Sequence, residues 1–181
     1  CHSAAEGWSD NRAVSLGVAK RKGGRHSMPV LTAAHQPWWF WDGRADSMWS
    51  QAIAAMESEA EMDFSRAQAA HYVAKRYGAQ YKAVFGALPN LGGVPQRGKP
   101  GLSAWDKLSP DKQAAVERVF ANVGKALEAY ERKLDCAETR FDQWSSGEVD
   151  MTQEEESGAA IFAREGCVDC HSGRNFSDGE F

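Results

Sequence analysis

Apolar residues recur every three or four positions along much of the chain, a spacing typical of helices that bury one face. The first such stretch covers about residues 44–56 and the second about residues 65–86. In the second stretch, the positions predicted to face inward are Ala70, Val73, Ala74, Tyr77, Tyr81 and Val84. The alternation typical of a half-buried strand does not persist anywhere, so the pattern predicts an all-α fold.

The clearest helix begins at Ser109, a good N-cap residue, with Pro110 at the first helical position. Its predicted core stripe consists of Val116, Val119, Phe120, Val123, Leu127, Tyr130 and Leu134. A last helix is predicted from the capping box of Thr152 and Glu155. Its predicted inner face carries Ala159 and Phe162.

Turn-forming residues separate the predicted helices. Residues 3–30 and 87–108 are rich in glycine, proline and small polar residues, which predicts long irregular loops. The polar stretch over 142–151 is predicted to be a linker. We therefore expect two units, an N-terminal domain over residues 1–147 and the beginning of a second domain over residues 148–181.

Composition narrows the classes of function. The 181 residues carry a formal net charge of -4, so the chain has no basic footprint for nucleic acid. The basic cluster over residues 20–25 is predicted to be a solvated surface. No apolar stretch approaches the roughly 20 residues that a membrane-spanning helix requires. We expect a globular protein with no membrane span and no nucleic-acid partner.

The segment Cys167-Val-Asp-Cys170-His171 is a complete C-x-x-C-H motif. Two thiols at this spacing reach the two vinyl groups of one porphyrin and the adjacent imidazole reaches the iron, which is the attachment chemistry of c-type haem. A zinc site would require a second pair of ligands, and a redox dithiol would follow a strand. Neither context is present. Cys136 stands apart from this motif, and we predict that it is a buried free thiol.

Cys1-His2 is interpreted as the end of a second C-x-x-C-H motif. We therefore expect the chain to be a piece of a longer protein, running from the end of one haem-attachment motif through the next complete one. In this interpretation, the haem-binding residues are Cys1, His2, Cys167, Cys170 and His171.

The chain also contains Arg25-His-Ser-Met-Pro29, Phe40-Trp-Asp-Gly-Arg-Ala45, Gln51-Ala52, Glu61-Met62, Phe120 to Glu131, Arg140-Phe-Asp142 and Gly173 to Asp178. Together these segments resemble the bacterial dihaem cytochrome c peroxidases and their MauG-like relatives. The resemblance covers essentially the whole chain, and the motifs are specific as a set although each is weak alone. It implies cytochrome c-like haem domains, one nearly complete and the second only begun.

The resemblance implies a division of labour between two haem c groups in the full-length protein. The N-terminal haem, with His2 as its proximal iron ligand, reduces hydrogen peroxide. The C-terminal haem, with His171 as its proximal iron ligand, accepts single electrons from a small donor protein of the cytochrome c or cupredoxin type. The resemblance also implies a periplasmic location, and a homodimer is compatible with it.

Three further roles follow from the resemblance. Glu61 matches a distal-pocket acid that moves a proton between the two peroxide oxygens. Gln51 matches an amide that orients peroxide or water, and Trp41 matches a tryptophan that relays electrons between the haems. The residues alone favour a plainer interpretation, in which Glu57, Glu59 and Glu61 form a solvated face and Trp41 belongs to the core.

Three positions depart from the family pattern. Val18 stands where members that need reductive activation carry a distal histidine, and valine cannot bind iron. Ala54-Ala55 replaces a Gly-Pro pair, which would let the preceding helix run on toward Glu61 and shift it. His26 replaces an asparagine of an interdomain calcium site, and a calcium ion is doubtful because imidazole is a poor calcium ligand.

The sequence favours a cytochrome-c peroxidase that reduces hydrogen peroxide to water, and two alternatives remain open. A MauG-like oxidase of a protein or other large substrate would use the same iron chemistry, with a tyrosine as distal ligand. A dihaem cytochrome that only transfers electrons would have two six-coordinate irons and no distal acid.

Overall fold

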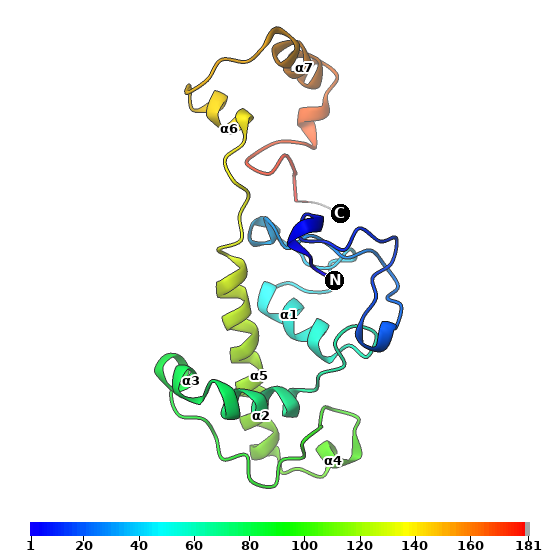
Figure 1. Cartoon of the computed structure of the whole chain (residues 1–181), viewed down its shortest axis with the longest axis vertical. Helices are drawn as coiled ribbons and strands as arrows, with labels where there is room; N and C mark the ends of the chain where they lie inside the picture. The colour runs from blue at the N-terminus through cyan, green and yellow to red at the C-terminus, as the bar shows by residue number, and fades with distance from the viewer. Residues whose placement is uncertain (180–181) are drawn as a thin grey trace.

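The computed structural model describes residues 1–179, which form two lobes joined by an extended segment (Figure 1). The N-terminal lobe contains α1 (Met48–Glu57), α2 (Arg66–Arg76), α3 (Gly78–Phe85), α4 (Ser103–Asp106) and α5 (Pro110–Glu131). The C-terminal lobe contains α6 (Arg140–Ser145) and α7 (Gln153–Arg164). Short 3-10 helices lie at Ala4–Glu6, Val18–Lys20, Ala33–His35 and Cys167–Asp169. Isolated bridges are the only β structure within residues 1–179, so the predicted all-α class is confirmed.

Helix α5 is the central helix of the N-terminal lobe, because α1 and α2 both pack against it (Figure 1). A larger apolar cluster consists of Ala67, Ala70, Val73, Tyr81, Val94, Trp105, Val116 and Val119. A smaller cluster joins Met56 of α1, Ala69 of α2 and Phe120 of α5. The stripe predicted for the long helix is thus confirmed at Val116, Val119 and Phe120. The prediction that Tyr130 belongs to this stripe is wrong, because Tyr130 lies in the last turn of α5 and is 55% exposed.

A close approach between α1 and α5 depends on Gly124, which is buried within α5. A Cβ atom at this position would lie 2.6 Å from the carbonyl oxygen of Trp49 and 2.8 Å from Cγ2 of Ile53. Glycine in a helix costs about 1 kcal/mol relative to alanine. That cost is offset here because the missing side chain lets the two helices pack closely.

The second predicted helix consists of two helices, α2 and α3. Tyr77 separates them with φ of -129° and ψ of 19°, outside the helical range. The inward face changes direction at this break, so that Tyr81 is buried whereas Tyr77 and Val84 are exposed. Ala74 is exposed as well. The prediction of one continuous helix is wrong here because the spacing of apolar residues continues across a single non-helical residue.

The C-terminal lobe differs from the prediction at its first helix. Helix α6 lies partly within the stretch predicted to be a linker, and it begins with a capping box between Thr139 and Asp142. Phe141 of α6 packs against Phe176, with 5.0 Å between ring centroids. The capping box predicted at the start of α7 is confirmed, because Thr152 and Glu155 exchange their side-chain and backbone hydrogen bonds.

The segment between α5 and α6 also carries a contact between the lobes. The Asp135 carboxylate lies 3.4 Å from Nε2 of His35 and 3.2 Å from Nη2 of Arg174. Cys136 follows directly and is exposed. The prediction of a buried thiol is therefore wrong, since this extended segment has no apolar layer over it. The domain division after residue 147 stays a prediction, and the last two residues of the second predicted domain lie outside the described residues.

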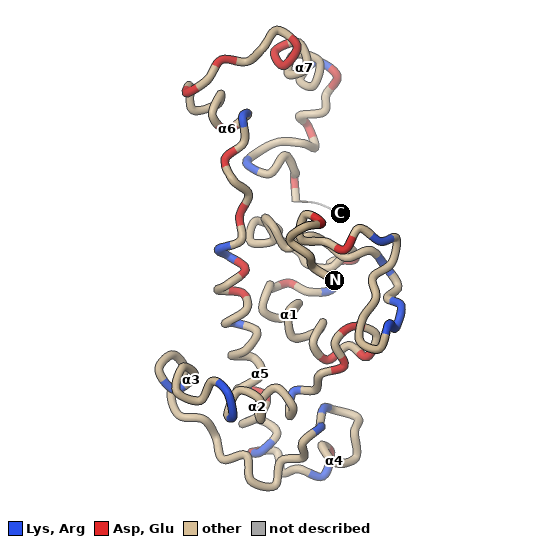
Figure 2. Tube along the Cα trace, viewed as in Figure 1, with Lys and Arg blue, Asp and Glu red and all other residues tan. Residues whose placement is uncertain are grey.

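None of the helices described between residues 1 and 179 is long and apolar enough to cross a membrane. Acidic and basic side chains are distributed over both lobes (Figure 2). In the N-terminal lobe, a group of basic residues in the first loop faces an acidic segment that follows α1 (Figure 2).

Candidate functional site: two cavities, each beside a Cys-His pair

A cavity of about 330 Å³ lies among the N-terminal loops, α1 and the end of α5. The structure brings five residues singled out in the sequence to its walls: Cys1, His2, Trp41, Gln51 and Glu61. They come from the N-terminus, the loop before α1, the first half of α1 and the loop after it. The roles assigned to them stay predictions, but their arrangement around one cavity is an observation.

The His2 imidazole is oriented by its Nδ1 atom, which lies 3.2 Å from the carbonyl oxygen of Trp8 and 3.3 Å from Oγ of Ser27. A carbonyl oxygen only accepts hydrogen bonds, so Nδ1 carries the proton and Nε2 keeps its lone pair. This tautomer is the one that a metal-bound histidine uses, with its second nitrogen fixed by a backbone acceptor. Cys1 and His2 therefore fit the thiol and imidazole end of a haem-attachment motif.

Trp41 lies in a turn that polar contacts hold in place. Its indole Nε1 donates a hydrogen bond to the carbonyl oxygen of His26 at 2.8 Å, and the side chain is 52% exposed. The next residue, Asp42, is paired with Arg44 at 2.8 Å and with Arg25 at 2.7 Å. The hydrogen bond from Arg44, together with that from Arg25, lowers the pKa of Asp42 to about 2. The turn therefore keeps its ion pairs at neutral pH.

Gln51 and Glu61 reach the cavity from α1 and from the loop that follows it. Helix α1 continues through Ala54-Ala55 but ends at Glu57, where Ser58 adopts an extended conformation. The helix therefore does not run on to Glu61. Instead the loop folds back over the end of α1, because the backbone N–H groups of Met62 and Phe64 donate to the carbonyl oxygens of Ala55 and Met56, at 3.4 and 2.8 Å.

The loop that contains Val18 lies directly on the loop that contains Glu61. The backbone N–H of Val18 donates to the carbonyl oxygen of Glu61 at 2.6 Å. A Cβ atom on Gly17 would lie only 2.0 Å from the carbonyl oxygen of Ala60, so no other residue fits there without movement. The position that departs from the family pattern is thus next to the predicted acid.

One further carboxyl group on the cavity wall was not predicted. Glu131, at the end of α5, lines the same cavity as Glu61. Burial and, to a smaller extent, the charge of Glu128 raise the pKa of Glu131. Nothing in the sequence distinguishes this glutamate from the other acidic residues of a long amphipathic helix, and only the placement of the helix end reveals it.

A second cavity of about 730 Å³ lies in the C-terminal lobe beside His171. Its apolar wall consists of Phe141, Trp144, Met151, Ala159, Phe162, Val168 and Phe176. The predicted inner face of α7, Ala159 and Phe162, therefore points into this cavity. Nδ1 of His171 lies 3.0 Å from the carbonyl oxygen of Phe176, which again leaves the Nε2 lone pair free.

Cys167 is the first residue of the 3-10 helix Cys167–Asp169, and Cys170 directly follows that helix, next to this cavity. Neither cysteine forms a disulfide within the described residues. A large aromatic cavity, two thiols and an oriented imidazole fit a covalently attached haem c. The residues that would hold it are Cys167, Cys170 and His171.

Comparison with known proteins identifies the family. The family model described as di-haem cytochrome c peroxidase matches residues 1–150. The chain belongs to the dihaem cytochrome c peroxidase family, and membership implies haem c as the cofactor.

Relatives within this family include peroxidases and MauG proteins. The chain is 29% identical over 176 residues to cytochrome c551 peroxidase of Pseudomonas aeruginosa, an alignment covering 97% of this chain and 44% of that protein. It is 32% identical over 186 residues to methylamine utilization protein MauG of Methylorubrum extorquens, covering 100% of this chain and 45% of that protein. The chain therefore spans less than half the length of these relatives.

A solved structure of similar fold is the crystal structure of a MauG-like protein associated with microbial copper homeostasis. The TM-score is 0.64 at 21% sequence identity, with 100% of this chain and 48% of that chain covered. This likeness supports the helical, cytochrome c-like fold.

Proposed function

We propose that the full-length protein is a cytochrome-c peroxidase that reduces hydrogen peroxide to water. The observation that carries the proposal is the placement of an acid, Glu61, and an amide, Gln51, on the same cavity as the His2 imidazole. Haem c attached beside His2 supplies, when bound, the iron at which peroxide is reduced. Two electrons and two protons convert one hydrogen peroxide into two water molecules.

The side chains on the cavity wall supply the proton chemistry. The Glu61 carboxylate takes a proton from one peroxide oxygen and delivers it to the other, so that the O–O bond breaks with water as the leaving group. The Gln51 amide can both donate and accept hydrogen bonds, which suits it to orienting the peroxide for this transfer. Two further protons and the two electrons complete the second water.

Electrons would arrive one at a time through the second haem, held by His171. We assign their relay to Trp41, whose indole lies on the wall of the first cavity. A small cytochrome c or cupredoxin would be the donor, and the periplasm is the compartment in which such donors meet a c-type peroxidase.

We also propose that the peroxide-reducing haem is open in its oxidised state. Val18 offers no lone pair, and its loop is bonded to the backbone of Glu61. The loop that contains Val18 also contains a histidine, His26, which could in principle bind the iron in place of the missing distal histidine. Its Nδ1 is hydrogen bonded to the carbonyl oxygen of Arg12, and its Nε2 lies 3.1 Å from Oγ of Ser9. Both nitrogens of His26 are therefore occupied.

Glu61→Gln tests the proposal in the haem-loaded full-length protein. Turnover of peroxide with a reduced donor should fall by about 10²–10⁴-fold, the usual contribution of a general acid–base group, while haem content stays unchanged. Glu59→Gln is the matched control. Glu59 is two residues away with a 69% exposed side chain paired to Lys99, so this variant should turn over like the wild type. Equal rates in all three proteins would contradict the role of Glu61.

A MauG-type oxidase of a large substrate is the second candidate, because the identity to one MauG protein is 32% over the whole chain. The two functions differ in where the electrons originate. A peroxidase consumes two donor electrons per peroxide, whereas the oxidase would consume peroxide at the expense of a protein substrate with no donor present. Measuring donor oxidation per peroxide consumed separates the two functions.

A further inference from the structure

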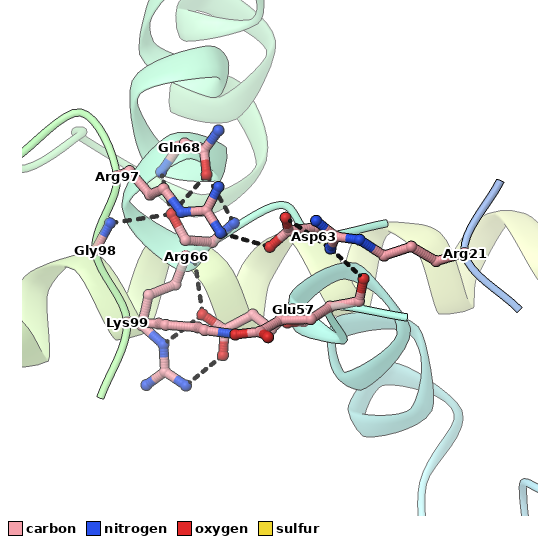
Figure 3. Close-up of polar contacts among 10 residues, drawn as sticks. Arg21, Glu57, Asp63, Arg66, Gln68, Arg97, Gly98 and Lys99 are labelled. Carbon is pink, nitrogen blue, oxygen red and sulfur yellow. Dashed lines mark hydrogen bonds and ion pairs between the residues drawn. The ribbon is translucent and has the colours of Figure 1, made fainter. Parts of the chain in front are cut away.

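Polar contacts hold the loop that carries Glu61, and those of Asp63 with Arg21 and Arg97 are drawn in Figure 3. None of these three residues lines the cavity. Asp63, two residues after Glu61, has φ of 49°, a left-handed conformation that aspartate tolerates better than most residues. Its Oδ1 atom lies 2.6 Å from Nη2 of Arg97, and its Oδ2 atom lies 3.1 Å from Nη1 of Arg21. One carboxylate thus connects the Glu61 loop to two other segments of the lobe.

Arg21 also contacts the backbone of the same loop. Its Nη1 atom donates a hydrogen bond to the carbonyl oxygen of Glu59 at 2.6 Å. Together with the hydrogen bond from Val18 to Glu61, this contact joins the N-terminal loop to the Glu61 loop at positions 59, 61 and 63. Arg21 lies in a cluster predicted to be a solvated surface, and its side chain is 48% exposed while it also binds this loop.

Polar contacts also hold the beginning of the loop. Glu57, the last residue of α1, accepts hydrogen bonds from the backbone N–H, Nε and Nη2 of Arg66 (Figure 3). Lys99 donates to the carbonyl oxygen of Glu57 at 3.0 Å. Because Lys99 and Arg97 belong to the same segment, that segment holds the loop at both ends.

Asp63 remains charged in this arrangement. Burial by itself would raise the pKa of Asp63, but the hydrogen bond from Arg21 and the charge and hydrogen bond of Arg97 outweigh it and leave that pKa below its ordinary value. The Asp63 side chain is 14% exposed, whereas the two arginine side chains are about half exposed. Because one carboxylate pairs with arginines from two other segments, these contacts restrict the position of the loop backbone.

We propose that Asp63 is a positioning residue for Glu61 and that Arg21 and Arg97 act through it. The inference rests on the proposed function of Glu61. Within residues 1–179 no hydrogen bond or ion pair fixes the Glu61 carboxyl group itself, so its place on the cavity wall depends on the backbone of its loop. A displacement of about 1 Å in a reacting group is enough to cost up to ~10²-fold in rate.

A double-mutant cycle in the haem-loaded full-length protein tests this proposal. Asp63→Asn should lower kcat for peroxide reduction on the order of ten-fold, with KM and haem content unchanged, because the amide cannot pair with both guanidinium groups. The variant that combines Asp63→Asn with Glu61→Gln should be no slower than Glu61→Gln alone, because a residue that acts through Glu61 has nothing left to position.

Two further variants test whether the effect is specific to the contacts of Asp63. Glu117→Gln removes a carboxylate–arginine pair on α5, to Arg66 at 2.8 Å, at a residue that does not line the cavity, and should leave kcat unchanged. Arg97→Gln removes one of the two partners of Asp63, and the Arg97 side chain is exposed. It should fold normally and show a smaller loss of kcat than Asp63→Asn, again with no added loss in the presence of Glu61→Gln.

The outcomes separate this proposal from the proposed function. A wild-type kcat in Asp63→Asn beside a strongly impaired Glu61→Gln would overturn the positioning role alone. Losses that multiply in the double variant would also overturn it, because they would show that Asp63 acts independently of Glu61. A wild-type kcat in Glu61→Gln would overturn the role of Glu61, and the positioning role with it.

Discussion

Residues 1–131 enclose two apolar clusters, whereas none of the described residues from 132 to 179 is buried. In the first region, helices α1, α2 and α5 cover one another. In the second, helices α6 and α7 turn their aromatic side chains toward a cavity beside His171. The N-terminal lobe thus buries apolar side chains against one another, whereas the aromatic side chains of the C-terminal lobe line a cavity.

The difference indicates what each lobe requires of its cofactor. Burying a large side chain contributes about 1.5–3 kcal/mol, and the C-terminal lobe gains little of this from its own chain. A porphyrin among Phe141, Trp144, Phe162 and Phe176 would supply the missing apolar contacts. We therefore infer that haem is structural as well as functional in this lobe, while α1, α2 and α5 pack without it.

The largest expected effect comes from removing the second haem. In Cys167→Ser/Cys170→Ser, the C-terminal lobe should lose its ordered structure, because its aromatic residues would have no porphyrin to pack against. Hydrogen exchange resolved along the chain should show α6 and α7 fully unprotected, with the protection of α2 and α5 retained. Protection of α7 equal to that of the haem-loaded protein would show that the C-terminal lobe folds without its haem.

A smaller effect is expected from Gly124→Ala in the N-terminal lobe. The added methyl group would overlap Trp49 and Ile53, so overpacking of about 1–3 kcal/mol should outweigh the gain in helix propensity. Gly78→Ala is the control, because its Cβ would meet only Leu88 at 3.8 Å. Denaturant unfolding should give a lower stability for Gly124→Ala than for the control. Equal stabilities would show that the contact between α1 and α5 is loosely packed.

The smallest effect concerns pH and the start of α7. The hydrogen bond from Arg140 is the main cause that lowers the pKa of Glu155 from 4.5 to about 2. A depressed pKa stabilises the folded form above pH 4.5, and this stabilisation is lost as the pH falls toward 2. The first turn of α7 should therefore fray over this range, and in Arg140→Gln it should fray at higher pH. Amide exchange near Thr152 would report it, and identical profiles would exclude the ion pair as the cause.

Local signals in the sequence predicted much of the fold. The N-cap and proline of α5 and the capping box of α7 are recognisable within a few residues, and the structure confirms both helices. The capping box of Thr139 and Asp142 is an equally local signal for α6, hidden within a stretch that looks like a polar linker. The break at Tyr77 has only a weak local signal, the glycine that follows it, Gly78, because a single glycine is tolerated within many helices.

The candidate site was predictable only in part. The C-x-x-C-H motif carries its chemistry in its spacing, so an iron-binding role for His171 could be predicted from a few residues. Glu61 could be distinguished from Glu57 and Glu59 only through the family resemblance. The contacts of Asp63 with Arg21 and Arg97 span 42 and 34 positions in the sequence, and no local pattern encodes such pairs.

Stopped-flow mixing of the fully oxidised, haem-loaded full-length protein with hydrogen peroxide tests the central claim that the Glu61 cavity is where peroxide is reduced. We predict a spectral change without a lag, at a rate proportional to peroxide, because Val18 has no lone pair to offer a haem held by His2. In Glu61→Gln the same change should be slower by at least about 10²-fold. A lag that one-electron pre-reduction removes would contradict the open state, and an unchanged rate in Glu61→Gln would contradict the assignment of the cavity.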